Sequence, residues 1–527
     1  MPGTVIISHD NYKVNPKLFD LIMATYKTPG VFIEEIAKLP PSVAEVATAI
    51  PAFIGYTQIT NKDSDGIHPV RISSLLEYET IFGKTRAVHF SVEVNDTEEE
   101  GTLQNRNTRV SIGGGLPANT MYYHLQLYFT NGGGSCYIVS VGREDINYFA
   151  KTDLLDGLSA AGQLDEPTIL IFPEAVSIPI NSVPEIPPAS EAFDAATDAF
   201  FAGTITQAEY KAAKDNYNLA IAMGQMSAMC DVYKPALAQC AQLGNRFLII
   251  DCLAGYPELI RHSNYGIGSD NLAYGAAYYP YLTTDIPFEY DESSSFVLHN
   301  VNNAPVGFTT VLNVAKINNN AMYNIAKQVL DQYFITLPPC SAIAAVYASV
   351  DRTRGVWKAP ANVSLNMVNG VTERISDAGQ ENLNIDPVGG KSINAIRQFT
   401  GKGTLVWGAR TLAGNDNEWR YIPVRRLFNM VENSISRAVS SFVFEVNDAN
   451  TWAKIQVMIG NYLTGLWQQG ALQGAKAADA FFVSIGLNKT MSAQDILEGR
   501  MIVEIGMAAV RPAEFIILRF SHLMAAS

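Results

Sequence analysis

Short, wholly apolar strands that alternate with helical stretches constrain the fold of this chain more than any other feature. Thr168–Phe172 (TILIF) and Arg246–Asp251 (RFLIID) are the clearest examples. A strand that is apolar on both faces has to be covered on both, as in a mainly parallel sheet with helices on its two sides. We therefore predict an α/β core over residues 151–395. Helices are expected at 154–163, 190–243 and 321–333, and further apolar segments lie at 276–281 and 342–350.

The region before this core, residues 36–150, is expected to hold a β-rich outer module and the first strands of the core. Its acidic stretch at 96–101 is typical of an exposed loop. The aromatic segment Tyr122–Thr130 is expected to be a strand. We interpret the glycines of Asn131–Gly134 as a hairpin connection to a second strand at Cys136–Val141.

The region after the core, residues 396–510, predicts an α+β domain that starts with a strand at Leu405–Arg410. Apolar residues then recur at helical spacing in two stretches, which predicts two long amphipathic helices. The first covers Pro423–Phe444 and the second contains Trp452 to Leu466. Ser492–Asp495 has the pattern of a capping box and predicts a third, short helix.

The charge of the 527-residue chain is unevenly distributed. The net charge is −14, but residues 391–527 carry 14 Lys+Arg against 10 Asp+Glu, a net charge of +4 that leaves −18 for residues 1–390. An acidic chain lacks the basic face that nucleic-acid binding requires, so no nucleic-acid partner is expected. The asymmetry suggests two surfaces that face different neighbours. Chance and solubility are the alternative explanation.

The cysteines and the apolar runs indicate folding in the cytoplasm. The five cysteines have no CxxC spacing and lie among apolar neighbours, as small buried residues do in a reducing compartment. No apolar run approaches the ~20 residues that a membrane span needs. The first residues also lack the basic start and apolar centre of a signal peptide. Direct membrane insertion is therefore not expected.

Signatures of catalysis are missing from the sequence, so we expect no enzyme activity, cofactor or metal. Gly389–Ser392 resembles the end of a phosphate-binding loop, but Ile385 stands where the motif needs glycine. The sequence contains no HExxH, no GxSxG and no paired Cys/His spacing. Asp351 and Arg354 are candidates for a buried ion pair or an interface pair.

Seven segments of the chain together carry a family resemblance. They are Thr28–Glu35 (TPGVFIEE), 129–141, 338–362, 394–397, 406–428, 470–474 and 511–515. In this order they resemble the sheath proteins of contractile tails, the family of phage tail sheaths and bacterial contractile injection systems. The resemblance covers the chain discontinuously from Met23. The sequence of the last domain is most similar to extracellular particles of the antifeeding-prophage and Photorhabdus virulence cassette type.

The resemblance implies a fold and a mechanical function. The family's central α/β domain is similar to subtilisin, but this chain lacks a subtilisin-like nucleophile segment, so catalysis is not implied. A catalytically active subtilisin-like or α/β hydrolase is the alternative. A sheath subunit stacks in sixfold rings around an inner tube and contracts to drive the tube through a target envelope. Residues 177–225 look like an insertion relative to shorter sheaths.

The implied partners are other copies of the chain, the inner tube protein, and baseplate and terminal cap proteins, with paralogous sheath subunits as an open possibility. Assembly is expected in the bacterial cytoplasm, and the particle is then either released or anchored at the envelope. Both chain ends, 1–35 and 511–527, are expected to be extended arms that add strands to sheets of neighbouring subunits. The expected strand-exchange residues are Val31, Phe32, Ile33, Phe515, Ile516, Ile517 and Leu518.

Two further contacts follow from the charge asymmetry and the short helix. The basic C-terminal domain is expected to face inward, and its short helix to touch the tube. Arg425 and Arg426 are expected to meet acidic residues of a neighbouring subunit, with ion pairs inside the chain as the alternative. The expected tube-contact residues are Ser492, Gln494, Asp495, Glu498 and Arg500.

Overall fold

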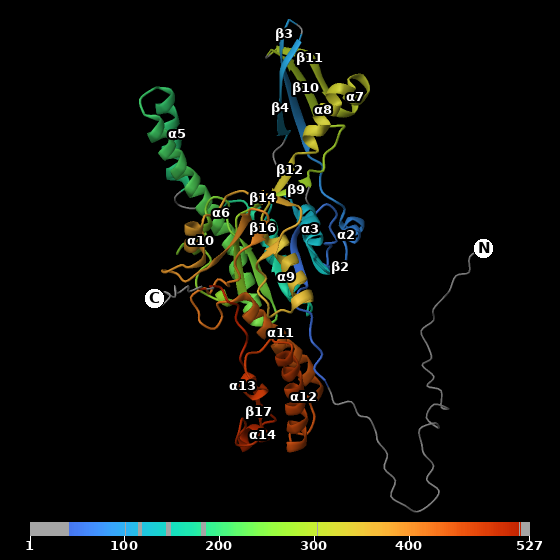
Figure 1. Ribbon diagram of the computed structural model, residues 1–527, viewed down its shortest axis with the longest axis vertical. Coiled ribbons are helices and arrows are strands. Elements are labelled where there is room, and N and C mark those ends of the chain that lie inside the picture. Colours follow the sequence, from blue (N-terminus) through green and yellow to red (C-terminus); the bar gives the residue numbers. More distant parts are fainter. Residues whose placement is uncertain are drawn as a thin grey trace, which may run out of the picture. The chain divides into compact units, whose positions relative to one another are not determined.

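The computed structural model describes residues 42–100, 102–113, 119–143, 149–180, 186–302, 304–515 and 517. Figure 1 shows the ribbon with the labels used below. Within the described residues the largest sheet has nine strands, in the order β13-β16-β15-β8-β7-β6-β1-β5-β2. Its six inner strands, from β15 to β5, are parallel, and the outer strands are antiparallel to their neighbours. The strands of this sheet are β1 (Pro51–Thr57), β2 (Val70–Ile72), β5 (Cys136–Arg143), β6 (Ile169–Ile171), β7 (Phe247–Asp251), β8 (Gly275–Tyr279), β13 (Val363–Ser364), β15 (Ile393–Phe399) and β16 (Gly403–Val406).

Helices cover both faces of this sheet, as the apolar strands predicted. Alternate residues of β7 point to opposite faces, so Phe247 and Ile249 belong to one apolar cluster and Leu248 and Ile250 to another. The first cluster includes residues of α3 and α9, and the second includes residues of α4 and α6. The mixed α/β architecture is therefore confirmed. These four helices are α3 (Met121–Thr130), α4 (Lys151–Gly162), α6 (Gln207–Leu243) and α9 (Cys340–Arg354).

The predicted strand at Tyr122–Thr130 is wrong, because this segment is helix α3. The aromatic residues favour strands, but a short apolar run cannot be told from a buried helix by its period. Tertiary packing decides here, since seven of the ten α3 residues are buried. Asn131–Gly134 therefore joins a helix to β5 and is not a hairpin connection. Gly132 has a φ of 90°, which suits the glycine that ends a helix.

Two smaller sheets extend from the strands of the core. A four-stranded sheet has the order β11-β10-β3-β4, and a three-stranded sheet has the order β12-β9-β14. Helices α7 and α8 contact the larger of the two. The elements of these sheets are β3 (His89–Glu99), β4 (Thr102–Gly113), β9 (Leu282–Pro287), β10 (Phe296–Val301), β11 (Ala304–Val311), β12 (Phe334–Leu337), β14 (Val368–Val371), α7 (Leu312–Asn318) and α8 (Asn320–Leu330).

The predicted acidic loop at 96–101 is also wrong, since Asp96–Glu99 continue β3 in its hairpin with β4. Asp96 is buried, and its carboxylate accepts hydrogen bonds from Arg106 at 2.6 Å and contacts His299 at 2.9 Å. The hydrogen bond from Arg106 is the main reason that the pKa of Asp96 falls to about 2. The sequence suggested that this carboxylate is solvated. In the structure it instead connects the strands β3, β4 and β10.

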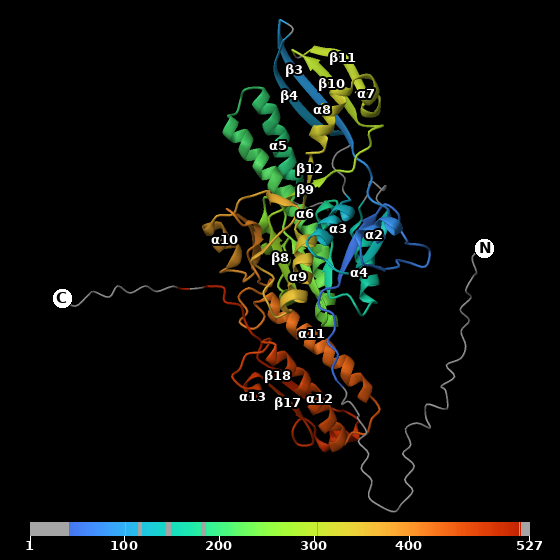
Figure 2. The ribbon, with the colours of Figure 1, turned by 45° about the vertical axis from the view of Figure 1, so that its right-hand side comes forward.

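The predicted helical stretch at 190–243 forms two helices, α5 (Ile186–Phe201) and α6 (Figure 2). Gly203 has a φ of 72° in the turn between them, and Thr206 and Glu209 form a capping box that starts α6. None of the described residues of α5 is buried. Its contacts with α6 rest on aromatic stacking, with the rings of Phe193 and Tyr217 at 5.3 Å.

The C-terminal region packs around a third apolar cluster, formed mainly by α11 and α12. Both long helices and the short third helix were predicted and are confirmed. The predicted strand at Leu405–Arg410 is shorter than expected, because β16 ends at Val406. The remaining elements are α2 (Leu75–Phe82), α10 (Asp377–Asn384), α11 (Ile422–Val439), α12 (Ala449–Gln468), α13 (Ala477–Ala480), α14 (Ala493–Leu497), β17 (Phe481–Ile485) and β18 (Val503–Met507).

None of the described helices combines the length and apolar character needed to cross a bilayer.

A buried carboxyl group connects the sheet to α9. Asp251 is the last residue of β7 and is almost wholly buried. Its Oδ1 accepts a hydrogen bond of 2.9 Å from the N–H of Cys340, the first residue of α9. Burial raises the pKa of Asp251 from its ordinary value of 3.8 to about 7. The carboxyl is therefore harder to ionise in the folded chain than in the unfolded chain.

This difference predicts a pH-dependent stability. Between pH 4 and pH 7 the unfolded chain releases the Asp251 proton and the folded chain retains it, so the free energy of unfolding contributed by this group falls as pH rises through that window. We expect Asp251→Asn, which keeps the acceptor oxygen, to remove this contribution. Urea unfolding of the unassembled subunit at pH 5 and pH 8 measures the effect. Equal pH dependence in the variant and the original chain would contradict it.

Candidate functional site

The residues expected to exchange strands lie mostly outside the described part of the chain. This holds for Val31, Phe32 and Ile33 and for Ile516 and Leu518. Phe515 and Ile517 are described, and their side chains are 67% and 77% exposed. Residues 511–515 carry no strand assignment in the single subunit. Strand exchange therefore stays a prediction, and the described part of the chain shows the contacts of the residues next to the two predicted arms.

The segment before β1 is hydrogen-bonded to two helices of the body. The N–H of Val46 donates to the hydroxyl of Ser434 on α11 at 3.1 Å. The hydroxyl of Thr48 donates to Asp351 on α9 at 2.6 Å, and the carbonyl of Thr48 accepts from Arg426 on α11 at 3.0 Å. The segment 46–48 is thus hydrogen-bonded to two helices that belong to different parts of the chain.

Asp351 and Arg426 form a buried ion pair at the centre of this junction. The guanidinium nitrogens lie 3.0 and 2.5 Å from the two carboxylate oxygens, and the side chains of Arg426 and Asp351 are only 3% and 6% exposed. The guanidinium also lies over the ring of Tyr347 at 4.5 Å. Asp351 therefore pairs with Arg426 and not with Arg354, which the sequence suggested. A bidentate pair in a water-poor site fixes both geometry and register.

Arg425 is also engaged inside the subunit. Its Nε donates to Asn429 at 2.7 Å, its Nη2 contacts Glu432 at 3.2 Å, and its guanidinium lies 4.1 Å from the centre of the Trp419 ring. The arrangement within the chain thus matches the alternative of internal ion pairs for both arginines. Contacts of Arg425 and Arg426 with a neighbouring subunit remain a prediction that a single chain does not test.

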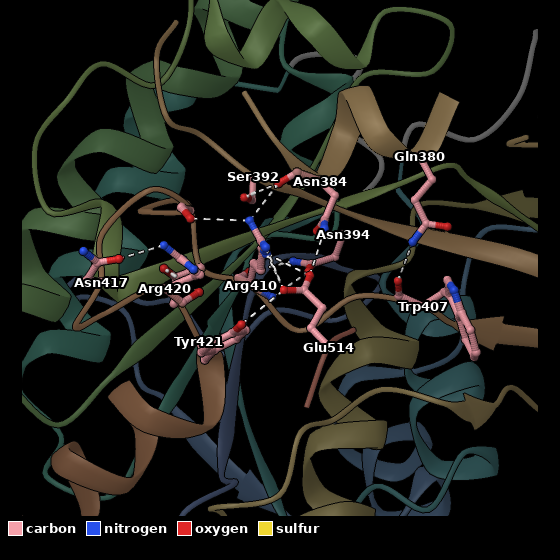
Figure 3. A network of polar contacts seen from close by, with 12 residues as sticks. Gln380, Asn384, Ser392, Asn394, Trp407, Arg410, Asn417, Arg420, Tyr421 and Glu514 are labelled. Atoms are coloured by element: carbon pink, nitrogen blue, oxygen red, sulfur yellow. Dashed lines mark hydrogen bonds and ion pairs between the residues drawn. The ribbon is translucent and has the colours of Figure 1, made fainter. Parts of the chain in front are cut away.

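Glu514, in the segment predicted to be the C-terminal arm, is bound to the body (Figure 3). Its carboxylate accepts hydrogen bonds from the Nε and Nη2 of Arg410, with the shortest at 2.6 Å. Asn384 Nδ2 donates to it at 2.8 Å and the Tyr421 hydroxyl at 3.1 Å. Burial raises the pKa of Glu514, but hydrogen bonds from Arg410 and Asn384 outweigh this effect and hold it below the usual value.

A small sheet with open edges lies close to this point in the sequence. Among the described residues, β17 and β18 form a two-stranded antiparallel sheet, so each strand has one edge without a partner. Phe482 on β17 is among the exposed large apolar side chains. Unpaired main-chain groups on such edges can accept a further strand.

The residues expected to contact the tube form one connected cluster around α14. Ser492 and Asp495 make the predicted capping box, with the N–H of Ser492 donating to Asp495 at 2.9 Å. Arg500 lies 3.0 Å from Asp495, and Gln494 donates to Glu498 at 2.7 Å. The cluster is at the surface, so it is available for a contact. Contact with a tube remains a prediction.

One polar group in the core resembles part of a hydrolase site, and sequence reasoning missed it. The Nδ1 of His124 lies 2.8 Å from the Oγ of Ser341, and both side chains are completely buried. Burial lowers the pKa of His124 to about 3, which makes it a weak general base. A substrate cannot reach this pair in the described conformation. The described residues also bring together no group of His, Cys, Asp or Glu that could hold a metal ion.

Substituting Arg426 tests how much its ion pair with Asp351 contributes to the stability of the subunit. We expect Arg426→Met to lower the free energy of unfolding by ~3–5 kcal/mol, because it leaves Asp351 charged and buried without its partner. Arg437→Met on the same helix is the matched control. Arg437 is exposed, so the expected change is within ~0.5 kcal/mol. Urea unfolding of the unassembled subunit measures both. A loss no larger than that of the control would show that the pair does not hold α11 in place.

Comparison with known proteins identifies the family of this chain. Residues 414–522 match a family model described as the phage tail sheath C-terminal domain. The curated tail sheath protein of Vibrio phage KVP40 is 29% identical over 136 residues, 26% of this chain and 20% of the relative. The alignment therefore spans only about a fifth of that curated relative.

Two solved structures are similar over nearly the whole chain. The anti-feeding prophage helical sheath in the contracted state is 32% identical, with a TM-score of 0.55 over 94% of this chain and 99% of the other. The sheath complex of PVC, an extracellular contractile injection system, is 29% identical in its contracted state, with a TM-score of 0.57 over 95% of this chain and 98% of the other. Because a relative above 30% identity is matched almost from end to end, this chain belongs to the family of contractile tail sheath proteins.

Proposed function

We propose that this chain is the structural subunit of the sheath of a phage-tail-like injection particle. Copies of it polymerise as stacked sixfold rings around an inner tube, and their contraction drives the tube through a target envelope. The observation that carries this proposal is the similarity to the helical sheath of the anti-feeding prophage over 94% of the chain. The further partners are the inner tube protein, baseplate and terminal cap proteins and, where the particle has them, paralogous sheath subunits.

Negative-stain microscopy of the native particles tests the proposal directly. We expect rods that contain this chain and occur in a long and a short form, with the tube exposed in the short form. Rods of one length under every condition, or particles that lack this chain, would count against it. The expected assembly in the cytoplasm is tested by the same microscopy on sections of producing cells.

The domain plan of the subunit is part of the proposal. Residues 1–35 and 511–527 serve as arms, 36–150 as an outer module with the first core strands, 151–395 as the sheath core with 177–225 inserted, and 396–510 as the inward-facing domain. The likeness of the core to subtilisin is proposed for its fold alone. It is supported by a mainly parallel sheet covered on both faces.

Strand exchange links the subunits in this proposal. A donated arm needs an unpaired sheet edge, and β17 and β18 each offer one among the described residues. The arm needs apolar side chains without a partner in its own subunit, and Phe515 and Ile517 are exposed. Main-chain hydrogen bonds across such an edge give affinity that survives reorientation of the subunit body.

Deleting an arm is expected to stop assembly without unfolding the subunit. Each lost junction would remove about five main-chain hydrogen bonds at ~1 kcal/mol each. The deletions are 1–35 and 515–527, and the second keeps Glu514 and its contacts. Sheath formation is scored by microscopy, and the melting temperature of the unassembled subunit should stay unchanged. The matched control replaces 515–527 by a Gly/Ser segment of equal length, which should also fail. Normal sheaths from either deletion would falsify strand exchange through that arm.

The α14 cluster is proposed to contact the inner tube. Its helix is short and capped, and Leu497 on it is 82% exposed. An apolar side chain surrounded by Asp495, Glu498 and Arg500 is typical of a contact with a polar rim.

Reversing one charge in this cluster tests the contact. We expect Glu498→Lys to reduce the chemical crosslinks between sheath and tube by about tenfold, because a like or unpaired charge at a contact is unfavourable. Glu191→Lys on the exposed helix α5 is the matched control and should leave the crosslinks unchanged. Crosslinks that avoid 485–505 altogether would rule the contact out.

A further inference from the structure

We propose that Arg410 and Glu514 form a latch that fixes the C-terminal arm to its own subunit, so that exchange is confined to residues beyond Glu514. This inference rests on the proposed strand exchange through the arm. It assigns Glu514 as a positioning residue, which acts by holding the point from which the arm leaves and not by contacting the neighbouring subunit.

The first observation is the number of donors that converge on one carboxylate. Arg410 donates from two nitrogens, Asn384 from its amide and Tyr421 from its hydroxyl (Figure 3). These donors come from the end of α10, the segment after β16 and the residue before α11. A carboxylate held by three segments has both its position and its orientation fixed. A bidentate guanidinium adds directional specificity.

The second observation is that Arg410 is held by the body of the subunit as well as by Glu514. Arg410 is only 5% exposed, and its Nη1 also donates to the carbonyls of Asn384 and Gly414. Its own N–H donates to the side chain of Asn394 at 2.8 Å. The guanidinium is therefore oriented by the body of the subunit. A buried cation of this kind requires an anion, and Glu514 supplies it at 22% exposure.

The third observation is where Glu514 lies along the chain. The chain after β18 stays bonded to the body up to Val510, whose N–H donates to Ala471. Among the described residues after Val510, Glu514 alone makes hydrogen bonds to the body. The next residue, Phe515, is exposed. Among the described residues, the last one that is hydrogen-bonded to the body thus lies immediately before the apolar residues that the proposed exchange would donate.

Anchoring the chain at Glu514 sets how far the arm can reach during contraction. An arm that reaches a neighbour has a reach set by the number of residues after its last anchor. If the anchor were lost, 511–514 would join the free segment, and the donated strand could slip in register on its acceptor. A side-chain latch prevents the slip while the residues beyond it change direction.

The test measures the mobility of the arm root in the unassembled subunit. The five native cysteines are buried, so Ala513→Cys can be labelled selectively with a nitroxide. The measured quantity is the ratio of mobile to immobilised nitroxide at position 513. We expect Glu514→Gln to raise this ratio by about tenfold to a hundredfold, the range for losing charged hydrogen bonds. Tyr421→Phe, which removes one of the donors, should raise it less. The matched control is Asp377→Asn, which neutralises an exposed carboxylate that pairs with Arg397. Asp377 and Glu514 line the same surface pocket.

Sheath formation by the same variants completes the test. We expect Glu514→Gln to give short or disordered sheaths from subunits that still fold, and Asp377→Asn to give normal ones. Unchanged label mobility in Glu514→Gln, or normal sheaths despite a mobile root, would overturn the latch. Failure of the 515–527 deletion to assemble, together with normal assembly of Glu514→Gln, would overturn the latch alone. Normal sheaths from that deletion would overturn arm exchange itself and the latch with it.

Discussion

The ion pair between Asp351 and Arg426 is the interaction on which the arrangement of this subunit depends. It joins α9, which covers one face of the large sheet, to α11, which builds the core of the C-terminal region. Thr48 bonds to both members just before the chain enters β1, in the interior of the sheet. In a site with so little water, each charge is stable only while the other is in place. The sheet, the C-terminal helices and the N-terminal segment are therefore held in one geometry.

Helix α11 also connects the segment before β1 with the segment after β18. Ser434 and Arg426 hold the segment at Val46 and Thr48, and Tyr421, immediately before the helix, bonds to Glu514. A helix is rigid over this length, so the contacts at Thr48 and at Glu514 keep a fixed separation. In a polymer linked through its arms, such a helix would carry force from one junction to the next.

The buried polar groups of the sheet serve the fold. Asp251 caps α9, and His124 bonds to Ser341 inside the core. Both sites are closed to solvent, and an enzyme of similar architecture would need such groups in an open pocket. The candidate functional surfaces are instead exposed apolar residues, sheet edges and charged clusters at the periphery. This distribution is what a subunit that works by assembly requires.

The sequence by itself determined the covered parallel sheet, both long C-terminal helices and the capped helix at 492, because each depends on a local pattern of apolar or capping residues. It misassigned 122–130, where burial on nearly all sides removes the helical period, and 96–101, where Arg106 and His299 neutralise an apparently exposed acid. It could indicate that the two ends are arms but not where they are anchored. Only the tertiary structure decided that Arg426 meets Asp351, 75 residues away, and that Arg410 meets Glu514, 104 residues away. A charged side chain carries no mark of its partner in its own segment, so the pairing is set by which helices and loops the apolar core brings together.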